Sequence, residues 1–139
     1  MFEQNFAFKI IFFIVVLVVF AVVKNYWPMS RAQRDRLMMA KSLLGANQAM
    51  LLDVRELSEL SMSGLAESAQ HFAFSEFKAN PDNLLKKFGI SSSTTVFIYC
   101  ASGIRAQKVV AWLKQKNITA ESLGGLKDLK NDFTIVRKK

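Results

Sequence analysis

One stretch of the chain constrains the fold more than any other: an apolar run that ends at the only cysteine, Cys100, and continues into a helical pattern. The residues of the run, 96–99, are all β-branched or aromatic, which predicts a strand buried on both faces. Ser102 and Gly103 interrupt the run, and from Ala106 onward apolar residues recur at helical spacing. We therefore expect Cys100 between the carboxyl end of a strand and the amino end of a helix, the edge where ligands bind in open α/β sheets.

A thiol at this position has distinctive surroundings. It would meet unpaired backbone N–H groups and the positive end of the helix dipole, both of which favour the thiolate. Arg105 adds a fixed positive charge nearby. A thiolate in such a cradle can attack an electrophilic sulfur or a phosphorus atom. The alternative is structural, since an unpaired cysteine is often a small buried hydrophobe.

Three motifs, in their order and spacing, resemble the rhodanese (sulfurtransferase) domain. They are Leu51-Leu52-Asp53-Val54-Arg55-Glu56, Cys100-Ala101-Ser102-Gly103-Ile104-Arg105 and Leu123-Gly124-Gly125-Leu126. The resemblance spans residues 45–136 and implies an α/β, three-layer fold with a parallel β-sheet between helices. It also implies that Cys100 is catalytic, that residues 101–105 bind the substrate, and that Asp53 and Arg55 support the site. For Arg55, an exposed salt bridge at a strand end is the structural alternative.

The same resemblance implies a thiosulfate sulfurtransferase-like enzyme. It would move a sulfane sulfur from an anionic donor such as thiosulfate to a thiol or cyanide acceptor through a Cys100 persulfide, with no cofactor and no metal. Because the chain has one cysteine, no intramolecular disulfide or Cys-cluster metal site is expected, and an external acceptor must discharge the persulfide. A catalytically weak or inactive binding module of the same fold, tethered at the membrane, is the alternative.

A phosphatase with a Cys/Arg loop is the nearest rival chemistry. The related dual-specificity phosphatases place five residues between the cysteine and the arginine, enough for a phosphate, whereas this chain has four, 101–104. The shorter loop favours a sulfur atom. His71 is the only histidine, and we expect it at a surface or turn rather than beside Cys100.

One segment departs from the rhodanese pattern. The family usually carries Gly-His-Ile-Pro-Gly-Ala, where this chain reads Gly64-Leu65-Ala66-Glu67-Ser68-Ala69. The first glycine and the last alanine remain, but the histidine, the proline and the second glycine do not. The family pattern therefore does not define the shape of this loop, and its departure motivates the binding-module alternative.

The remaining elements alternate between strands and helices. We predict strands at 49–54 and 118–123, a helix at 80–89, and a short helix at 126–130. The helix at 80–89 has an Asn-Pro-Asp start and a glycine at its end, which are typical helix boundaries. Such alternation with short connections predicts a parallel sheet covered on both faces.

An apolar run near the amino terminus predicts one transmembrane helix. Counted from Phe6 to Val23 it has 18 residues, near the short end of the length that spans a bilayer. Tyr26 and Trp27 fall where an aromatic belt would lie, and Pro28 would end the helix. A cleaved signal peptide is the alternative, disfavoured because no basic residue precedes Lys9 and no small-x-small cleavage site follows the run.

The sequence therefore divides into four predicted segments. They are a short extracytoplasmic tail (1–5), the transmembrane helix (6–27), a basic juxtamembrane linker and helix (28–44) and the rhodanese-like domain (45–139). Lys9 precedes the unbroken apolar part of this run, residues 10–23, and five basic residues follow it by position 41. The positive-inside rule then predicts a single-pass protein of the inner (cytoplasmic) membrane with its domain in the cytoplasm, where a reduced cysteine is stable.

Charge also bears on the expected partners. The formal net charge is +8, and half of it lies in residues 1–44. The rest is scattered without a basic stripe interleaved with aromatic residues, which argues against nucleic acid. The expected partners are an anionic sulfur donor, a thiol acceptor and the lipid bilayer through residues 6–27; a membrane-protein partner is a further hypothesis.

Overall fold

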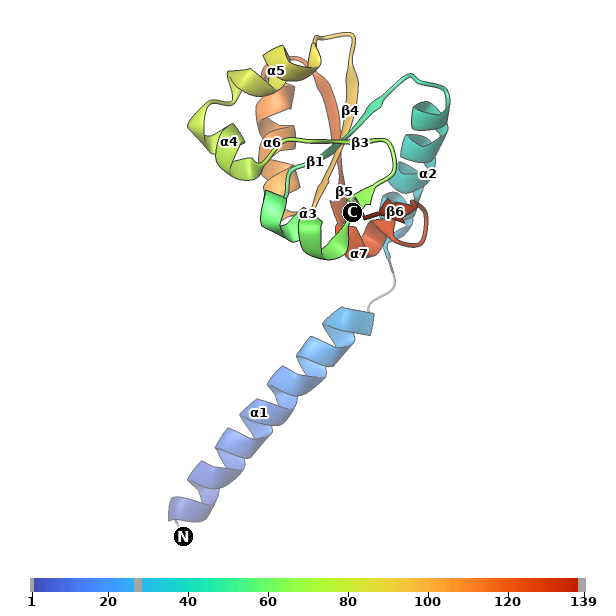
Figure 1. The fold of residues 1–139 in the computed structure, drawn as a ribbon. Helices are drawn as coiled ribbons and strands as arrows, with labels where there is room; N and C mark the ends of the chain where they lie inside the picture. The colour runs from blue at the N-terminus through green and yellow to red at the C-terminus, as the bar shows by residue number, and fades with distance from the viewer. Residues whose placement is uncertain (1, 27–28, 138–139) are drawn as a thin grey trace. The chain divides into compact units, whose positions relative to one another are not determined.

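The computed structural model of the protein describes residues 2–26 and 29–137. The chain divides into two compact units, Met1–Ser30 and Arg31–Lys139. The first contains the helix α1 (Phe2–Tyr26), and the second contains every other helix and strand (Figure 1). Trp27 and Pro28, the predicted belt residue and helix end, lie outside the described residues.

Helix α1 contains a long apolar segment. Its segment Phe6–Val23 has 18 residues and a mean hydropathy of 3.1, and none of it is buried within the protein. Within residues 2–26 and 29–137 it is the one helix long and apolar enough to cross a membrane, although a signal sequence has the same properties. The helix begins at Phe2 and so includes most of the residues predicted as a short tail.

The second unit is built on a parallel sheet, which confirms the predicted α/β fold. Its spatial order is β3-β1-β4-β5, and every neighbouring pair runs parallel. The strands are β1 (Met50–Asp53), β3 (Ala69–His71), β4 (Thr95–Cys100) and β5 (Thr119–Gly125). Helices cover both faces: α4 (Phe74–Ala79), α5 (Asp82–Phe88) and α6 (Ile104–Gln115) lie on one side, and α2 (Arg31–Gly45) and α7 (Leu126–Leu129) on the other (Figure 1).

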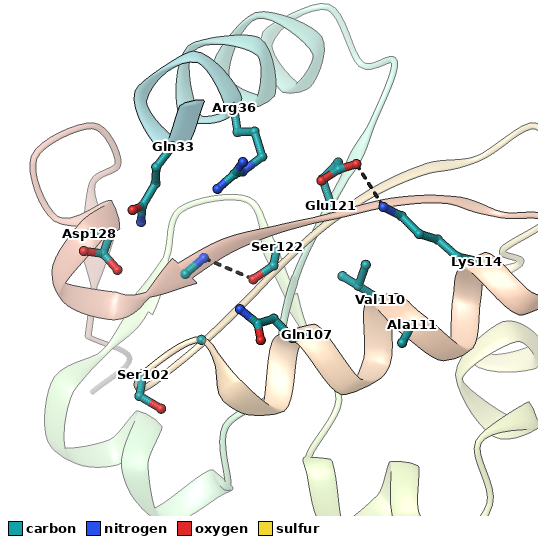
Figure 2. Close-up of a pocket in the computed structure, with 12 residues that line it drawn as sticks. Gln33, Arg36, Ser102, Gln107, Val110, Ala111, Lys114, Glu121, Ser122 and Asp128 are labelled. Carbon is teal, nitrogen blue, oxygen red and sulfur yellow. Dashed lines mark hydrogen bonds and ion pairs between the residues drawn. The ribbon is translucent and has the colours of Figure 1, made fainter. Parts of the chain in front are cut away.

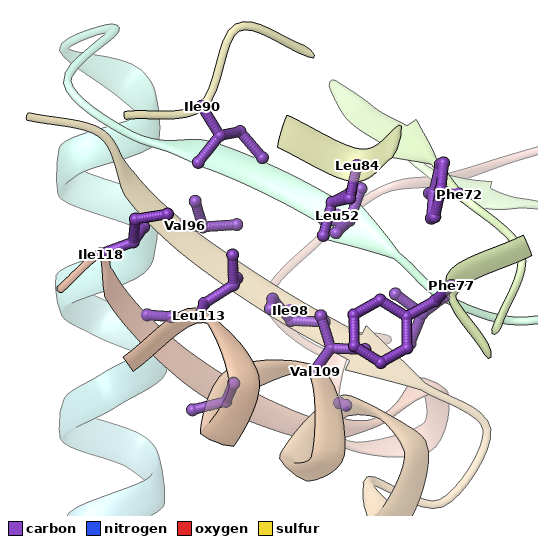
Figure 3. Close-up of a cluster of buried hydrophobic side chains, with 14 of the residues drawn as sticks. Leu52, Phe72, Phe77, Leu84, Ile90, Val96, Ile98, Val109, Leu113 and Ile118 are labelled. Atoms are coloured by element: carbon purple, nitrogen blue, oxygen red, sulfur yellow. The ribbon is translucent and has the colours of Figure 1, made fainter. Parts of the chain in front are cut away.

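The central strand β4 is buried on both faces, as its sequence predicts. Val96, Ile98 and Cys100 point to one face because side chains alternate along a strand, and they belong to one buried cluster with Val109 and Leu113 of α6. Figure 3 shows Val96, Ile98 and the two α6 residues in this cluster. The intervening residues of β4 are also fully buried, against the opposite layer. Burial of each such apolar side chain contributes about 1.5–3 kcal/mol, so this strand fixes the position of its carboxyl end firmly.

Helix α2 belongs to the same compact unit as the sheet. Leu37 and Ala40 lie three positions apart on one face of the helix and are buried, in keeping with the contact between α2 and β5. The compact unit thus starts at Arg31, whereas the sequence alone assigned this helix to a juxtamembrane segment and began the domain at Gly45. Helix α5, by contrast, ends as predicted at Gly89, which adopts the left-handed conformation with φ 62°.

The segment that departs from the family pattern contains the short strand β2 (Leu65–Ala66). It follows the helix α3 (Leu57–Ser63), and β2 pairs antiparallel with β6 (Ile135–Val136). Gly64 has φ 81°, and a Cβ added there would lie 2.7 Å from the Val136 carbonyl oxygen, so only glycine fits. Ser68 also has a positive φ, 67°, at the position where the family usually carries its second glycine.

Candidate functional site

The strand–loop–helix segment places Cys100 where the sequence predicted. Cys100 is the last residue of β4, it is fully buried, and α6 begins at Ile104. The Gly103 N–H donates a hydrogen bond to Cys100 Sγ at 3.0 Å. Gly103 has φ 95°, a left-handed conformation that turns the loop back over the sulfur and that glycine adopts without strain. We call residues 101–105 the cradle loop.

Two glycines of the third motif let the cradle loop pack closely against the end of β5. A Cβ added at Gly125 would lie 2.5 Å from the Ala101 carbonyl oxygen, and one added at Gly103 would lie 3.2 Å from Gly124 Cα. A larger residue at Gly125 would push the loop away from the sheet. The Gly-Gly motif therefore acts through backbone packing: it sets the distance between the cradle loop and its support.

Arg105 is held by an acidic residue that the sequence did not single out. Its Nη1 and Nη2 donate to Glu59 Oε2 and Oε1 of α3 at 2.7 and 2.8 Å, a bidentate ion pair. Hydrogen bonds from Arg105 lower the pKa of Glu59 from 4.5 to about 2, and Glu59 in turn raises the pKa of Arg105. Cys100 makes a smaller contribution to the raised pKa of Arg105.

Glu59 also fixes the start of its own helix. Its Oε2 accepts a hydrogen bond from the Glu56 N–H at 2.8 Å, three residues earlier in the chain. The Glu56 carboxylate in turn accepts hydrogen bonds from the N–H and hydroxyl of Ser75, at 3.0 and 2.7 Å, at the start of α4. Glu59 is thereby a positioning residue: it orients Arg105 from a helix end that is itself anchored to a second helix.

Asp53 and Arg55 form a second, fully buried ion pair beside the end of β4. Arg55 Nε donates to Asp53 Oδ2 at 2.9 Å and its Nη2 donates to the same oxygen at 2.7 Å, while the Arg55 N–H donates to Asp53 Oδ1 at 2.9 Å. The two residues are 0% and 1% exposed, so an exposed salt bridge does not describe them. Burial alone would lower the pKa of Arg55, but the hydrogen bond and charge of Asp53 overcome that effect and raise it.

The remaining donors of Arg55 tie this pair to the end of α3. Nη1 donates to Ser63 Oγ at 2.6 Å, and Nη2 donates to the Gly64 carbonyl oxygen at 2.5 Å. Tyr99 completes the network: its ring centroid lies 5.8 Å from the Arg55 guanidinium carbon, and its hydroxyl accepts from the Ala66 N–H at 3.0 Å. Burial, followed by the nearby Asp53, raises the pKa of Tyr99, which keeps it a neutral phenol.

The structure thus brings most of the predicted residues together. Cys100 and the cradle loop form one surface, and Asp53 lies beside it because Asp53 pairs with Tyr99 in the register of β1 and β4. His71 Nε2 forms a hydrogen bond of 2.8 Å with the Arg55 carbonyl oxygen at the end of β3, so it belongs to the scaffold. Within the described residues no group of three or more His, Cys, Asp or Glu side chains is placed to hold a metal ion.

Comparison with known proteins agrees with this geometry. The family model described as Rhodanese-like domain matches residues 38–132. A rhodanese-like domain protein from Staphylococcus aureus is 27% identical, with a TM-score of 0.55 over 70% of this chain and 91% of that one. No curated protein matches the chain.

Two further solved structures share the fold at lower identity. The human single-domain sulfurtransferase TSTD1 is 18% identical, with a TM-score of 0.56 over 70% of this chain and 95% of that one. A rhodanese-related protein from Thermoplasma volcanium is 20% identical, with a TM-score of 0.54 over 71% of this chain and 95% of that one. The family match, residues 38–132, lies within the second unit, which contains the cradle loop.

Proposed function

Because the chain belongs to the rhodanese-like family, whose model matches residues 38–132, we propose that it is a membrane-anchored sulfurtransferase that carries sulfur on Cys100. The donor is an anionic sulfur compound such as thiosulfate, and the acceptor is a thiol or cyanide. No cofactor takes part, since the cysteine itself holds the transferred atom.

One contact carries this proposal: the hydrogen bond of 3.0 Å from the Gly103 N–H to Cys100 Sγ. A backbone donor aimed at a sulfur atom at the amino end of α6 stabilises negative charge on that atom without any reorganisation. Two species in the reaction carry such charge, the attacking thiolate and the terminal sulfur of the persulfide. The N–H groups of residues 101–105 are the proposed donors for both.

The chemistry proceeds in two displacements. The Cys100 thiolate attacks the outer sulfur of thiosulfate, a new S–S bond forms at Cys100, and the S–S bond of thiosulfate breaks as sulfite leaves with the electron pair. An acceptor thiolate or cyanide then attacks the outer sulfur of the persulfide. That step breaks the S–S bond at Cys100 and restores the thiolate, so the two steps need no external oxidant or reductant.

Arg105 is the residue proposed to attract the anionic donor. Its side chain is 25% exposed, so it is open to solvent, while Glu59 fixes the direction of its guanidinium. Asp53 and Arg55 act through the scaffold, because they have no exposed surface with which to touch a substrate. Phosphatase activity is disfavoured because four residues, not five, separate Cys100 from Arg105.

Helix α1 supports the membrane part of the proposal. The unburied segment Phe6–Val23 is long enough to anchor the chain, and the basic residues that follow it favour a cytoplasmic domain at the inner membrane. Deletion of residues 1–29 tests this role. We expect the truncated protein to leave the membrane fraction and to keep its sulfur transfer in solution; a loss of transfer in a folded truncated protein would show that α1 does more than anchor.

The deciding experiment is an intact-mass measurement of the full chain in neutral detergent after exposure to thiosulfate. We expect an adduct of one sulfur atom that maps to Cys100, disappears on addition of cyanide with release of thiocyanate, and never forms in Cys100→Ser. Because Cys100 is the only cysteine, the adduct has no other thiol on which to form. Absence of the adduct in a folded protein would instead favour the binding module without turnover.

A further inference from the structure

A polar groove lies on the outer side of the cradle loop, between α2, β5 and α6 (Figure 2). Its volume is about 530 Å³, which is in the range of pockets that hold small organic molecules. Arg36 enters it from α2, Gln107 from α6 and Ser122 from β5, and Ser102 and Gly103 of the cradle loop close one end. The groove is therefore distinct from the interior of the cradle, where Cys100 Sγ lies.

Arg36 has an unmet hydrogen-bonding requirement in this groove. Its Nε is buried and has no hydrogen-bond partner in the part of the chain that the structure describes. Figure 2 shows the side chain reaching from α2 toward β5. A buried N–H without an acceptor is unfavourable, and such groups in native proteins are almost always satisfied. An acceptor oxygen from a ligand would satisfy it.

The other charged residues of the groove already have partners. Lys114 Nζ lies 3.1 Å from Glu121 Oε1, and Asp128 Oδ2 accepts a hydrogen bond from the Gly125 N–H at 2.8 Å. Among the described residues no carboxylate forms an ion pair with Arg36. Of the two cations that line the groove, Lys114 is paired with Glu121, so within the described residues Arg36 is the cation left to bind a ligand.

We propose that this groove binds a small organic anion in solution through its carboxylate or phosphate group, with Arg36 as the principal contact. A guanidinium presents donors in a planar fork that matches either oxyanion. The Gln107 amide and the Ser122 hydroxyl supply neutral polar groups on the opposite wall, and Val110 and Ala111 offer apolar contact for the rest of the molecule. The site goes beyond sulfur transfer, since binding here requires no reaction at Cys100.

The position of the site links it to the cradle loop. Ser102 and Gly103 line the groove on their outer side, and the inner side of Gly103 donates its N–H to Cys100 Sγ. A bound anion packs against the residues that hold that hydrogen bond. Binding of an anion in the groove would therefore change the surroundings of the cradle loop without any contact between the anion and the sulfur.

Calorimetric titration of the full chain tests the site, with inorganic phosphate and acetate as probes. The protein is kept in an uncharged detergent and in a buffer without phosphate. We expect saturable binding of at least one probe, weakened at least tenfold in Arg36→Gln. Arg34→Gln is the matched control, because Arg34 lies on the same helix, is exposed and does not line the groove. Equal weakening in both variants, or no saturable binding to the unmodified chain, would overturn the proposal.

Two further variants locate the ligand. Ala111→Leu narrows the groove without removing a charge, and we expect it to weaken binding in a protein that remains folded by circular dichroism. Retained binding in Ala111→Leu would overturn the assignment to this groove. Cys100→Ser should bind the probe as tightly as the unmodified chain does. This result does not depend on whether Cys100 of the unmodified chain forms a persulfide. Loss of binding in Cys100→Ser would place the anion inside the cradle and refute a separate site.

Discussion

Two arginine–carboxylate pairs lie at the same end of the sheet and differ mainly in burial. The Asp53–Arg55 pair has side chains that are 0% and 2% exposed, whereas the Glu59–Arg105 pair has side chains that are 33% and 25% exposed. Both pairs use two guanidinium donors at hydrogen-bonding distance. Their chemistry is the same, so the difference in exposure decides what each can do.

The buried pair has no capacity left for a ligand. Two further donors of Arg55 bind Ser63 and Gly64, and its side chain is only 2% exposed, so a ligand has no surface of this guanidinium to contact. Arg105, by contrast, binds Glu59 and keeps a side chain that is 25% exposed at the end of the cradle loop. One pair therefore holds the scaffold and the other presents a positive charge to the site.

The largest expected effect follows from Arg55→Met, which leaves Asp53 buried without a counter-charge. Removal of one partner of a buried ion pair typically costs about 3–5 kcal/mol, so we expect a loss of that order in the free energy of unfolding of the domain. Denaturant unfolding of the full chain in detergent micelles, followed by circular dichroism, measures it.

The double variant Asp53→Asn, Arg55→Met is the control for that effect. It removes both charges, so it should be more stable than Arg55→Met alone, since no uncompensated carboxylate remains. A loss of less than about 1 kcal/mol in Arg55→Met would contradict the scaffold role, because that is the range of exposed pairs.

Arg105→Gln should show the opposite profile. The partly exposed pair contributes about 1 kcal/mol or less to stability, whereas loss of a charge that stabilises the reacting sulfur should lower sulfur transfer by roughly 10²-fold. Steady-state kinetics with thiosulfate and cyanide tests the expected loss of rate, and denaturant unfolding tests the small expected loss of stability. Arg105→Lys keeps the charge without the bidentate geometry and should recover part of the rate. A decrease in the free energy of unfolding as large as that of Arg55→Met would contradict the distinction between the two pairs.

The same contrast explains what the sequence could reveal. Asp53 and Arg55 are two residues apart at the end of a strongly apolar strand, and the cysteine loop follows the next strong strand, so both stand out locally. Glu59 is 46 residues from Arg105, and no local pattern marks it as the partner of the loop arginine. A contact of that kind is created only by the fold, when α3 and the cradle loop meet.

Short elements were missed for a related reason. Helices α3 and α4 have seven and six residues, too few for a helical period to emerge, and β2 and β6 have two residues each. Helix α5 is also short, but its Asn80 and Gly89 mark both ends, and Asn80 Oδ1 accepts from the Asp82 N–H at 3.2 Å. Boundary residues thus predict short helices where periodicity fails. The groove at Arg36 was not predicted, because it joins α2 to a strand more than eighty positions later.

A smaller effect should appear in the acid stability of the partly exposed pair. The folded-state pKa of Glu59 is about 2, lowered from 4.5 chiefly by Arg105. The unfolded chain therefore binds this proton first, so the contribution of Glu59 to stability is complete above pH 4.5 and disappears as the pH falls toward 2. As the pH falls across this range, the free energy of unfolding should decrease less steeply in Glu59→Gln than in the unmodified chain. Glu67→Gln, at an exposed carboxylate that forms no ion pair with the residues the structure describes, should leave the slope unchanged; an equal change would implicate general surface charge.

The smallest expected effect concerns the turn that the buried pair supports. Ser68 has φ 67°, and a left-handed conformation costs an L-residue about 1–2 kcal/mol that glycine does not incur. Ser68→Gly should therefore raise the free energy of unfolding by up to about 1 kcal/mol, part of the gain being offset by the greater entropy of the unfolded chain. Sulfur transfer should not change, because the turn contacts the scaffold through Gly64 and Arg55 rather than through Arg105. Asn117→Gly is the comparison: Asn117 has φ 60°, but asparagine tolerates this conformation better, so its gain should be smaller. A change in transfer rate without a change in stability would mean that this turn belongs to the site and not to its support.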